Sequence, residues 1–471
     1  MTTTHGTTHQ QLAHDPGARA LKKVAGPFLL WGIAVGAVIS GDYYGWNAGL
    51  GLTGYWGFLV AIFVMGVAYL ALALVIGELA GAIPHSGGAY AYVRSALGKV
   101  WGYIAGVSVL LEFVISPVAV SLTVGAYIQI LFPSVPVLVS AAITYIVSIA
   151  LHLTGAASSM KVEFVITAIA VLGLVVFMVI GAPSVSFDNL NAYSNGAILP
   201  HGVSGLWAAL PLAAWFYFAI ESLPMSAEET RHPKDLAKAL ILAWITLTVV
   251  GLGTLTVAAG IGNESFPEAA APLAVALQVV VGNAGWIVPV ITIFSLIALL
   301  ASFHAILLGY SRQVFALSRA GYLPVWLSNL NSRKVPHWAL IVPAIFGYVF
   351  VIIGDKVLPD AIPALVTLSV MVAAVSYILM MLSAIVLRRK RPELHRPYRV
   401  PGGTVLMWVG LVLSAILIPA ALMSFPIAFV IGVVAIAAFL AYYYAVGSKR
   451  VGDMSAEEEL ALVDSAEAEL G

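Results

Sequence analysis

The sequence is dominated by long apolar runs, each close to the length that spans a lipid bilayer. A helix needs about 20 consecutive apolar residues to cross the hydrocarbon core. Only 9% of the 471 residues are charged, whereas soluble domains carry about 25%. A chain with so little polar surface cannot stay in water, so we expect a membrane protein with many spans.

Hydropathy and helix-breaking residues predict twelve spans. A β-barrel is excluded because these runs are continuous rather than alternating. Lipid-exposed backbone must satisfy its own hydrogen bonds, so we expect an all-α membrane protein with 12 transmembrane helices. The predicted spans are 25–51, 56–82, 100–131, 136–154, 161–182, 205–226, 237–261, 284–312, 337–354, 362–388, 404–423 and 426–447.

The positive charges predict the orientation of these spans. Of the 22 Lys and Arg residues, 21 fall on one side of the arrangement and only Lys356 falls on the other. Positive charge collects on the cytoplasmic side, so both termini are expected there, in a multi-pass protein of the cell membrane. The predicted cytoplasmic tails are residues 1–24 and an acidic segment, 448–471.

An acid interrupts the first span. Asp42 lies in the run Ser40-Gly41-Asp42-Tyr43-Tyr44-Gly45-Trp46-Asn47. A carboxylate at membrane depth costs roughly 2.5–3.5 kcal/mol on insertion scales, so it needs a reason to be there. The glycines on both sides allow the helix to break, which would free backbone groups for binding.

A second acid, Glu221, interrupts the sixth span 179 residues after Asp42. This separation corresponds to five spans, an odd number, so the second unit would enter the membrane from the opposite side. Paired interrupted spans in two halves are typical of a transporter site. We therefore expect inverted repeats over 25–182 and 183–388, followed by two C-terminal helices within 389–447.

Three motifs beside these spans resemble those of the amino acid–polyamine–organocation superfamily. They are Gly77-Glu78-Leu79-Ala80 with Pro84-His85-Ser86-Gly87-Gly88-Ala89-Tyr90, Ala227-Glu228-Glu229-Thr230-Arg231-His232-Pro233, and Ser311-Arg312-Gln313-Val314-Phe315-Ala316-Leu317-Ser318-Arg319-Ala320-Gly321-Tyr322-Leu323-Pro324. The resemblance implies a 5+5 inverted repeat plus two helices, with helices 1 and 6 broken. The residues around Asp42 and Glu221 look most like the ethanolamine permease branch, although Ser222 stands where that pattern has glycine.

The resemblance also suggests a binding site. Permeases of this fold typically hold a substrate carboxylate at a glycine-rich break in span one, and an aspartate there would repel a second carboxylate. Aromatic faces stabilise ammonium groups by about 0.5–2 kcal/mol. We therefore expect a small amine to bind here; purely structural roles are the alternative. The predicted binding residues are Asp42, Glu221, Ser40, Gly41, Tyr43, Trp46, Tyr217 and Trp215.

The energy source is less constrained. Glu112, Glu221 and His304 lie within predicted spans and are candidates for coupling or proton relay. Some proton-coupled relatives carry a lysine in span five, where the alignment places Ala170 in this chain. Coupling to H+ or Na+ and uniport therefore all stay open.

These features predict a secondary active transporter that imports a small organic cation, most simply ethanolamine, by alternating access. An amino acid or polyamine permease is the nearest alternative, and a channel or membrane sensor is a remote one. An intramembrane enzyme would need a nucleophile–base pair or a metal cluster, and the sequence shows neither. Beyond the bilayer and the solute we expect no cofactor, metal, nucleic acid or protein partner.

Overall fold

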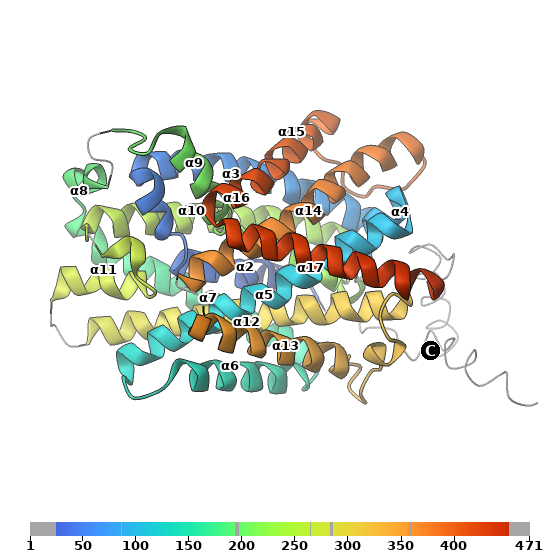
Figure 1. Cartoon of the computed structure of the whole chain (residues 1–471), viewed down its shortest axis with the longest axis horizontal. Coiled ribbons are helices and arrows are strands. Elements are labelled where there is room, and N and C mark those ends of the chain that lie inside the picture. The colour runs from blue at the N-terminus through green and yellow to red at the C-terminus, as the bar shows by residue number, and fades with distance from the viewer. Residues whose placement is uncertain are drawn as a thin grey trace, which may run out of the picture.

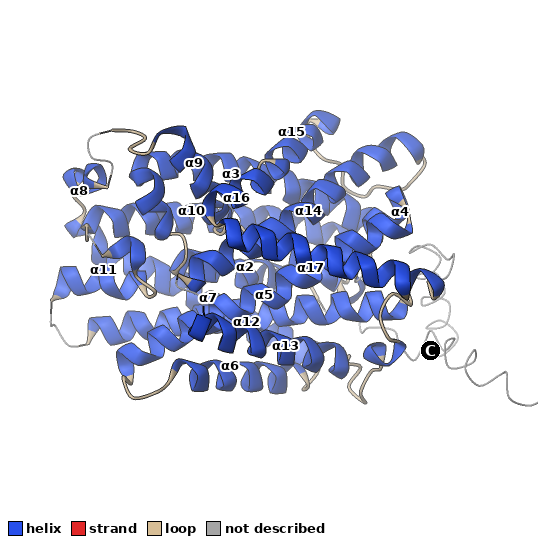
Figure 2. Ribbon diagram, viewed as in Figure 1, coloured by secondary structure: helices blue, strands red, loops and turns tan. Residues whose placement is uncertain are grey.

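The computed structural model describes residues 25–451, except 86, 194–196, 264, 283–285 and 358–359. The described residues form helices and no strand (Figure 2). A single bridge pairs Ala25 with Thr230. Residues 1–24 and 452–471, which make up nearly all of the two predicted tails, lie outside the described residues.

Helices account for all the predicted spans, in long and short forms. The long helices are α3 (Ala48–Ala82), α5 (Lys99–Leu131), α7 (Ala156–Gly181), α10 (Pro233–Ile261), α12 (Ile287–Arg319), α13 (His337–Val357), α14 (Ala361–Lys390) and α17 (Pro426–Ala445). The shorter ones are α2 (Pro27–Tyr43), α4 (Ala89–Leu97), α6 (Val137–His152), α8 (Phe187–Ala192), α9 (Gly202–Ala214), α11 (Pro272–Val281), α15 (Gly403–Ala415) and α16 (Leu417–Ser424).

In the described part of the chain, nine segments are long and apolar enough to cross a membrane. The predicted first, fourth and sixth spans correspond to the shorter apolar helices α2, α6 and α9. An all-helical membrane protein with many spans is thus confirmed. The count of twelve spans and the inverted repeat stay predictions.

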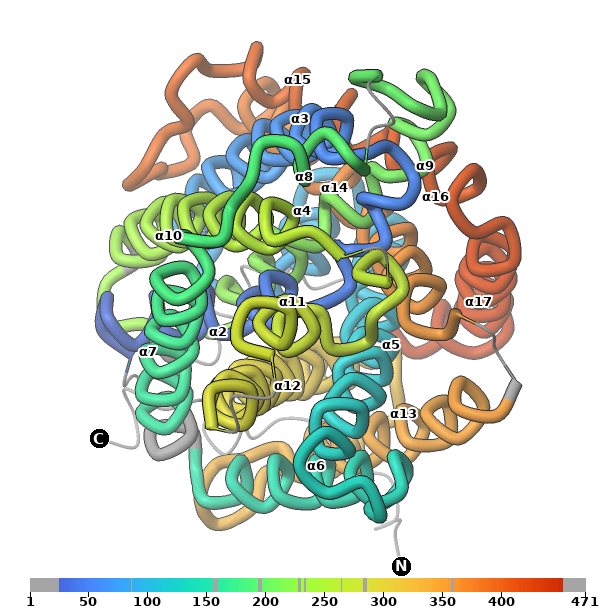
Figure 3. Tube along the Cα trace, turned by 90° about the vertical axis from the view of Figure 1, so that its left-hand side faces the viewer, coloured from blue at the N-terminus to red at the C-terminus, as the bar shows by residue number. Residues whose placement is uncertain are grey.

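Most long helices run along one axis of the molecule, side by side (Figure 1). Viewed along that axis, α2 lies in the interior, whereas α6, α13, α15 and α17 lie at the periphery (Figure 3). The peripheral helices expose large apolar side chains, among them Ile143 and Ile146 of α6 and Val430 and Val434 of α17. Such a surface is stable against lipid rather than water.

The first span breaks just after its acid. Helix α2 ends at Tyr43, Gly45 adopts a φ of 86°, and α3 begins at Ala48. Glycine takes this left-handed conformation without steric cost. Asp42 therefore lies in the last turn of the first half-helix, whereas we predicted that the acid would lie within the break.

The sixth span breaks just before its acid. Helix α9 ends at Ala214, and the backbone is irregular until Ala219, which has a left-handed φ of 72°. Glu221 lies in the first turn of the following 3-10 helix, η3 (Ile220–Glu229). Ser222, which stands where the family pattern has glycine, lies within η3 and after the irregular segment.

The predicted cytoplasmic ends of two helices are fastened together by a buried acid. Glu78 of α3 accepts hydrogen bonds from both Nε and Nη2 of Arg388 at the end of α14. It also accepts from the Val400 N–H at 2.7 Å and lies 3.4 Å from Arg396 Nε. Burial lowers the pKa of the Arg396 guanidinium, and the neighbouring Glu78 carboxylate opposes that shift. Glu78 thus ties α3 and α14 to the segment that leads into α15.

Candidate functional site

The two broken spans meet where the first carries glycine. A Cβ atom added to Gly41 would lie 2.3 Å from the carbonyl oxygen of Trp215. One added to Gly45 would lie 3.1 Å from Nε1 of the same residue. The Tyr44 ring meets the Trp215 ring edge-on, with centroids 5.8 Å apart. The predicted binding residues Gly41 and Trp215 are therefore in contact.

Asp42 is fully buried at this meeting point. Neither of its carboxylate oxygens has a hydrogen-bond partner among the described residues. Oδ1 faces Gly251 of α10, where an added Cβ would approach it to 2.8 Å. The carbonyl end of a helix carries partial negative charge, which disfavours a carboxylate and favours a cation. Asp42 consequently needs a proton or a positively charged group beside it.

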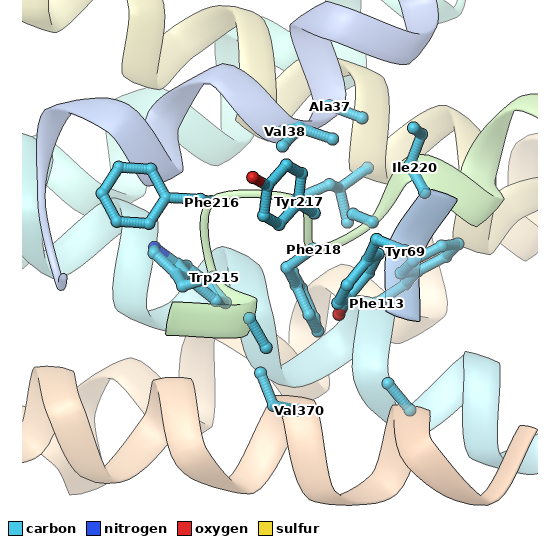
Figure 4. Close-up of a cluster of buried hydrophobic side chains, with 14 of the residues drawn as sticks. Ala37, Val38, Tyr69, Phe113, Trp215, Phe216, Tyr217, Phe218, Ile220 and Val370 are labelled. Carbon is cyan, nitrogen blue, oxygen red and sulfur yellow. The ribbon is translucent and has the colours of Figure 1, made fainter. Parts of the chain in front are cut away.

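Aromatic rings surround this acid. Trp46 donates a hydrogen bond from Nε1 to the Asp42 carbonyl oxygen at 3.1 Å and packs against Phe216 at 5.7 Å. Tyr217 lies within range of the Asp42 charge and stacks on Tyr69 at 5.6 Å. The rings at 215–218 point to different sides of the irregular segment (Figure 4). Trp46 thus lies beside Asp42, and Tyr217 belongs to the irregular segment of the neighbouring span.

The second acid belongs to a neighbouring cluster. Tyr377 of α14 donates a hydrogen bond to Oε1 of Glu221 at 2.8 Å, and its hydroxyl lies 3.4 Å from that of Tyr69. The carboxyl group of Glu112 from α5 lies against that of Glu221. Two adjacent carboxylates repel each other, so the pair requires a shared proton or a cation. The two predicted relay acids, Glu112 and Glu221, are therefore together.

Asp42 and Glu221 do not contact each other directly. The described contacts connect their clusters through Tyr217, which stacks on Tyr69, which in turn approaches Tyr377. The site is thus two acidic clusters separated by aromatic rings. In the part of the chain that the structure describes, no three His, Asp or Glu side chains group as metal ligands.

Three other predicted residues are engaged elsewhere. Ser40 donates to Ser302 Oγ of α12 at 2.7 Å, a contact that packs α2 against α12. Tyr43 donates to the Ala170 carbonyl oxygen of α7 at 2.6 Å. His304 stacks on His152, with ring centroids 3.7 Å apart.

The break in span one is also fastened to the segment between the predicted seventh and eighth spans. Nδ2 of Asn47 lies 2.9–3.1 Å from the carbonyl oxygens of Phe266, Pro267 and Ala269, and its two hydrogens are shared among these three acceptors. Its Oδ1 accepts the Gly45 N–H at 3.1 Å. The amide of Asn47 therefore holds the break against the short 3-10 helix η4 (Phe266–Glu268).

Sequence reasoning missed several residues that the structure brings forward. Glu163 of α7 is buried in a predicted span, and the criterion that identified Asp42, an acid inside an apolar run, would have found it. Tyr69 and Tyr377 complete the Glu221 cluster. A single tyrosine in an apolar helix gives no comparable signal.

Comparison with known proteins identifies the family. The sequence matches the amino acid permease family over residues 30–450. It is 26% identical to the branched-chain amino acid permease of Bacillus subtilis over 86% of this chain and 90% of that protein. It is 24% identical to an aromatic amino acid transport protein of Escherichia coli (74% and 78%) and 23% identical to a methylthioribose transporter of Bacillus subtilis (83% and 87%). The chain is therefore a transporter, not an enzyme, and belongs to the amino acid permease family.

Proposed function

We propose that this permease imports a small solute bearing an ammonium group, and that Asp42 binds that group. The observation that carries the proposal is the buried Asp42 carboxylate, which lacks a hydrogen-bond partner among the described residues and lies at the carbonyl end of α2. An ammonium group supplies both the missing charge and the missing donors. Trp46 and Tyr217 would stabilise the same cation through their ring faces.

An amino acid is the first candidate substrate. Two of the similar permeases carry branched-chain or aromatic amino acids by name. A zwitterion could place its ammonium group next to Asp42, so that its own positive charge separates the two carboxylates.

Ethanolamine is the second candidate, favoured by Asp42 itself. A solute without a carboxylate avoids repulsion by this acid altogether. In addition, the Gly45 N–H within the break is already bonded to Asn47, so it is not free for a substrate carboxylate. The relatives favour the first candidate and the acidic break favours the second. Direct competition between the two solutes distinguishes them.

The proposed mode of transport is alternating access, with both termini in the cytoplasm. The Glu112–Glu221 pair is a candidate proton relay within the site, because two neighbouring carboxyl groups readily share one proton. A carrier saturates at modest solute concentration. A channel would not saturate, and a sensor would give no flux.

The test uses purified protein in liposomes and measures exchange of labelled solute without an imposed ion gradient. We expect saturable exchange of leucine, phenylalanine or ethanolamine, and a loss of at least tenfold in Asp42→Asn. That loss matches the roughly 1.5–3 kcal/mol of a hydrogen bond to a charged group. Asp188→Asn, which changes an exposed acid before α9, is the matched control and should behave as wild type.

The outcome decides both the site and the substrate. Full exchange by Asp42→Asn would refute the assignment of the ammonium site. Exchange of leucine or phenylalanine that ethanolamine fails to inhibit would select the amino acid. Exchange of ethanolamine alone would select the second candidate.

A further inference from the structure

A third buried acid lies outside both clusters. Glu163 of α7 is 1% exposed and faces the glycine-rich side of α2. A Cβ atom added to Gly36 would lie 1.9 Å from Oε1 of Glu163, and one added to Gly32 would lie 2.9 Å from Cα of Phe164. The close approach of α7 to α2 therefore depends on these glycines. It brings the carboxyl group against the half-helix that carries Asp42.

One hydroxyl links this acid to the backbone of α2. Oγ1 of Thr167 lies 3.0 Å from the Gly32 carbonyl oxygen and 3.2 Å from Oε1 of Glu163. A threonine hydroxyl has a single hydrogen, so it can donate to only one of these two acceptors. If it donates to Gly32, its contact with Glu163 is a hydrogen bond only when the carboxyl group is protonated and donates.

No other residue that the structure describes supplies a counter-charge to Glu163. Oε2 of Glu163 has no hydrogen-bond partner in the described residues, and Thr167 is the only described group that interacts with this carboxyl. Lys161 on the same helix is exposed. The helices packed against α7 carry other titratable groups, none of which makes a described interaction with Glu163: Asp42 and Tyr43 on α2, Tyr145 and His152 on α6, Lys234, Asp235 and Lys238 on α10, and His304, Tyr310, Arg312 and Arg319 on α12.

We propose that Glu163 is a proton-binding site that couples proton movement to solute transport, with Thr167 as the link to α2. The inference rests on the proposed function, since it concerns the driving force of that transport. Glu163 takes up one proton from the outer side, becomes a neutral carboxylic acid, and releases the same proton to the cytoplasm.

The hydrogen bonds among Glu163, Thr167 and Gly32 explain how protonation of Glu163 changes the contact between α7 and α2. With Glu163 protonated, the acid donates to Thr167 and Thr167 donates to Gly32, so α7 holds α2. When the proton leaves, the charged carboxylate takes the threonine hydrogen, because hydrogen bonds to ionised acceptors are the stronger ones. The bond to Gly32 is then lost. Tyr43 still joins α2 to Ala170 two turns further along α7, so deprotonation frees one end of the contact.

The test measures solute accumulation in liposomes driven by an inside-alkaline pH gradient, beside gradient-free exchange. For one proton per solute we expect wild-type accumulation to rise about tenfold per pH unit. Glu163→Gln keeps a donor toward Thr167 and mimics the protonated acid. It should retain exchange while its accumulation ratio falls to about one. Glu393→Gln, which changes a 67% exposed acid far from α2 and α7 in the sequence, is the matched control and should accumulate solute as wild type does.

A second pair of variants tests the link independently of the acid. Thr167→Val removes the hydroxyl and should uncouple accumulation from the pH gradient, whereas Thr167→Ser should restore coupling. Infrared difference spectra of the wild type should show a protonated carboxyl signal that shifts in Glu163→Asp.

Several results would overturn the inference. These are accumulation by Glu163→Gln or Thr167→Val with the wild-type pH response, wild-type transport indifferent to the pH gradient, or no carboxyl signal assignable to Glu163. If the wild type exchanges solute but does not respond to the pH gradient, only this inference is overturned. Failure of all exchange by the wild type overturns the proposed function instead.

Discussion

At the scale of single residues, the glycines of α2 determine how closely neighbouring segments approach this helix. Gly41 brings the backbone of α2 against the carbonyl oxygen of Trp215, and Gly36 brings it against Glu163. Neither contact leaves room for a methyl group. The Trp215 backbone and the Glu163 side chain can approach α2 this closely only because these positions lack a side chain.

We expect Gly41→Ala to abolish solute exchange and to lower stability by about 1–3 kcal/mol, the usual cost of overpacking. The new methyl group would lie 2.3 Å from a backbone oxygen, which cannot move aside as a flexible side chain can. Exchange in liposomes and the melting temperature in detergent measure the two effects.

Gly81→Ala is the control for this change. An added Cβ there meets Pro397 at an ordinary 3.6 Å, within a helix. Alanine favours a helix over glycine by about 1 kcal/mol, so this variant should be unchanged or slightly more stable. Equal exchange by both variants would show that the contact with Trp215 is not required.

At the scale of helices, Glu78 is the fastening point of the predicted cytoplasmic side. It is 2% exposed and receives two guanidinium groups and one backbone N–H. Removing one partner of a buried ion pair leaves the other charge uncompensated, which is strongly destabilising.

Glu78→Gln should lower the stability of the folded protein by roughly 3 kcal/mol, at the low end for buried pairs because Arg388 is 20% exposed. Thermal unfolding in detergent checks this. Glu393→Gln removes an acid that is 67% exposed and 3.5 Å from Arg391, where an ion pair contributes about 0–1 kcal/mol. Similar melting temperatures for the two variants would argue against the fastening role of Glu78.

Helix extents follow from the sequence better than breaks do. The predicted span 100–131 is α5 (Lys99–Leu131), and the predicted span 337–354 falls within α13 (His337–Val357). Apolar length dictates these limits. The break in span six instead depends on the left-handed backbone of Ala219, which no residue type signals.

The candidate site was predicted in part, for a similar reason. Buried acids such as Asp42 are visible in an apolar run because membrane insertion makes them costly. Which groups face them is set by packing between distant segments. Tyr377, which bonds Glu221 from 156 residues away, could not have been assigned from local pattern.

At the scale of the whole molecule, the apolar outer helices are those of a membrane protein, and its positive charges predict, through the twelve expected spans, which side faces the cytoplasm. The sequence contains no cysteine, so single cysteines can be introduced into an otherwise unreactive chain. Topology can therefore be tested directly.

With both termini cytoplasmic, Asp188→Cys should react with a membrane-impermeant maleimide in intact cells. Glu393→Cys should react only in inverted vesicles or after permeabilisation. Both positions are exposed, so burial does not limit labelling. The reverse pattern would invert the orientation, and labelling of both positions from one side would contradict the span count between them.

The amide of Asn47 joins the break in span one to the segment 266–269 through three carbonyl oxygens, so the break and this segment move together. A solute that changes the geometry of the break in span one therefore also moves the segment 266–269, without contacting that segment. A solute that is too large for the site and keeps the break open also keeps the segment 266–269 displaced. The segment 266–269 can thus contribute to selection by size even after the solute has moved past it.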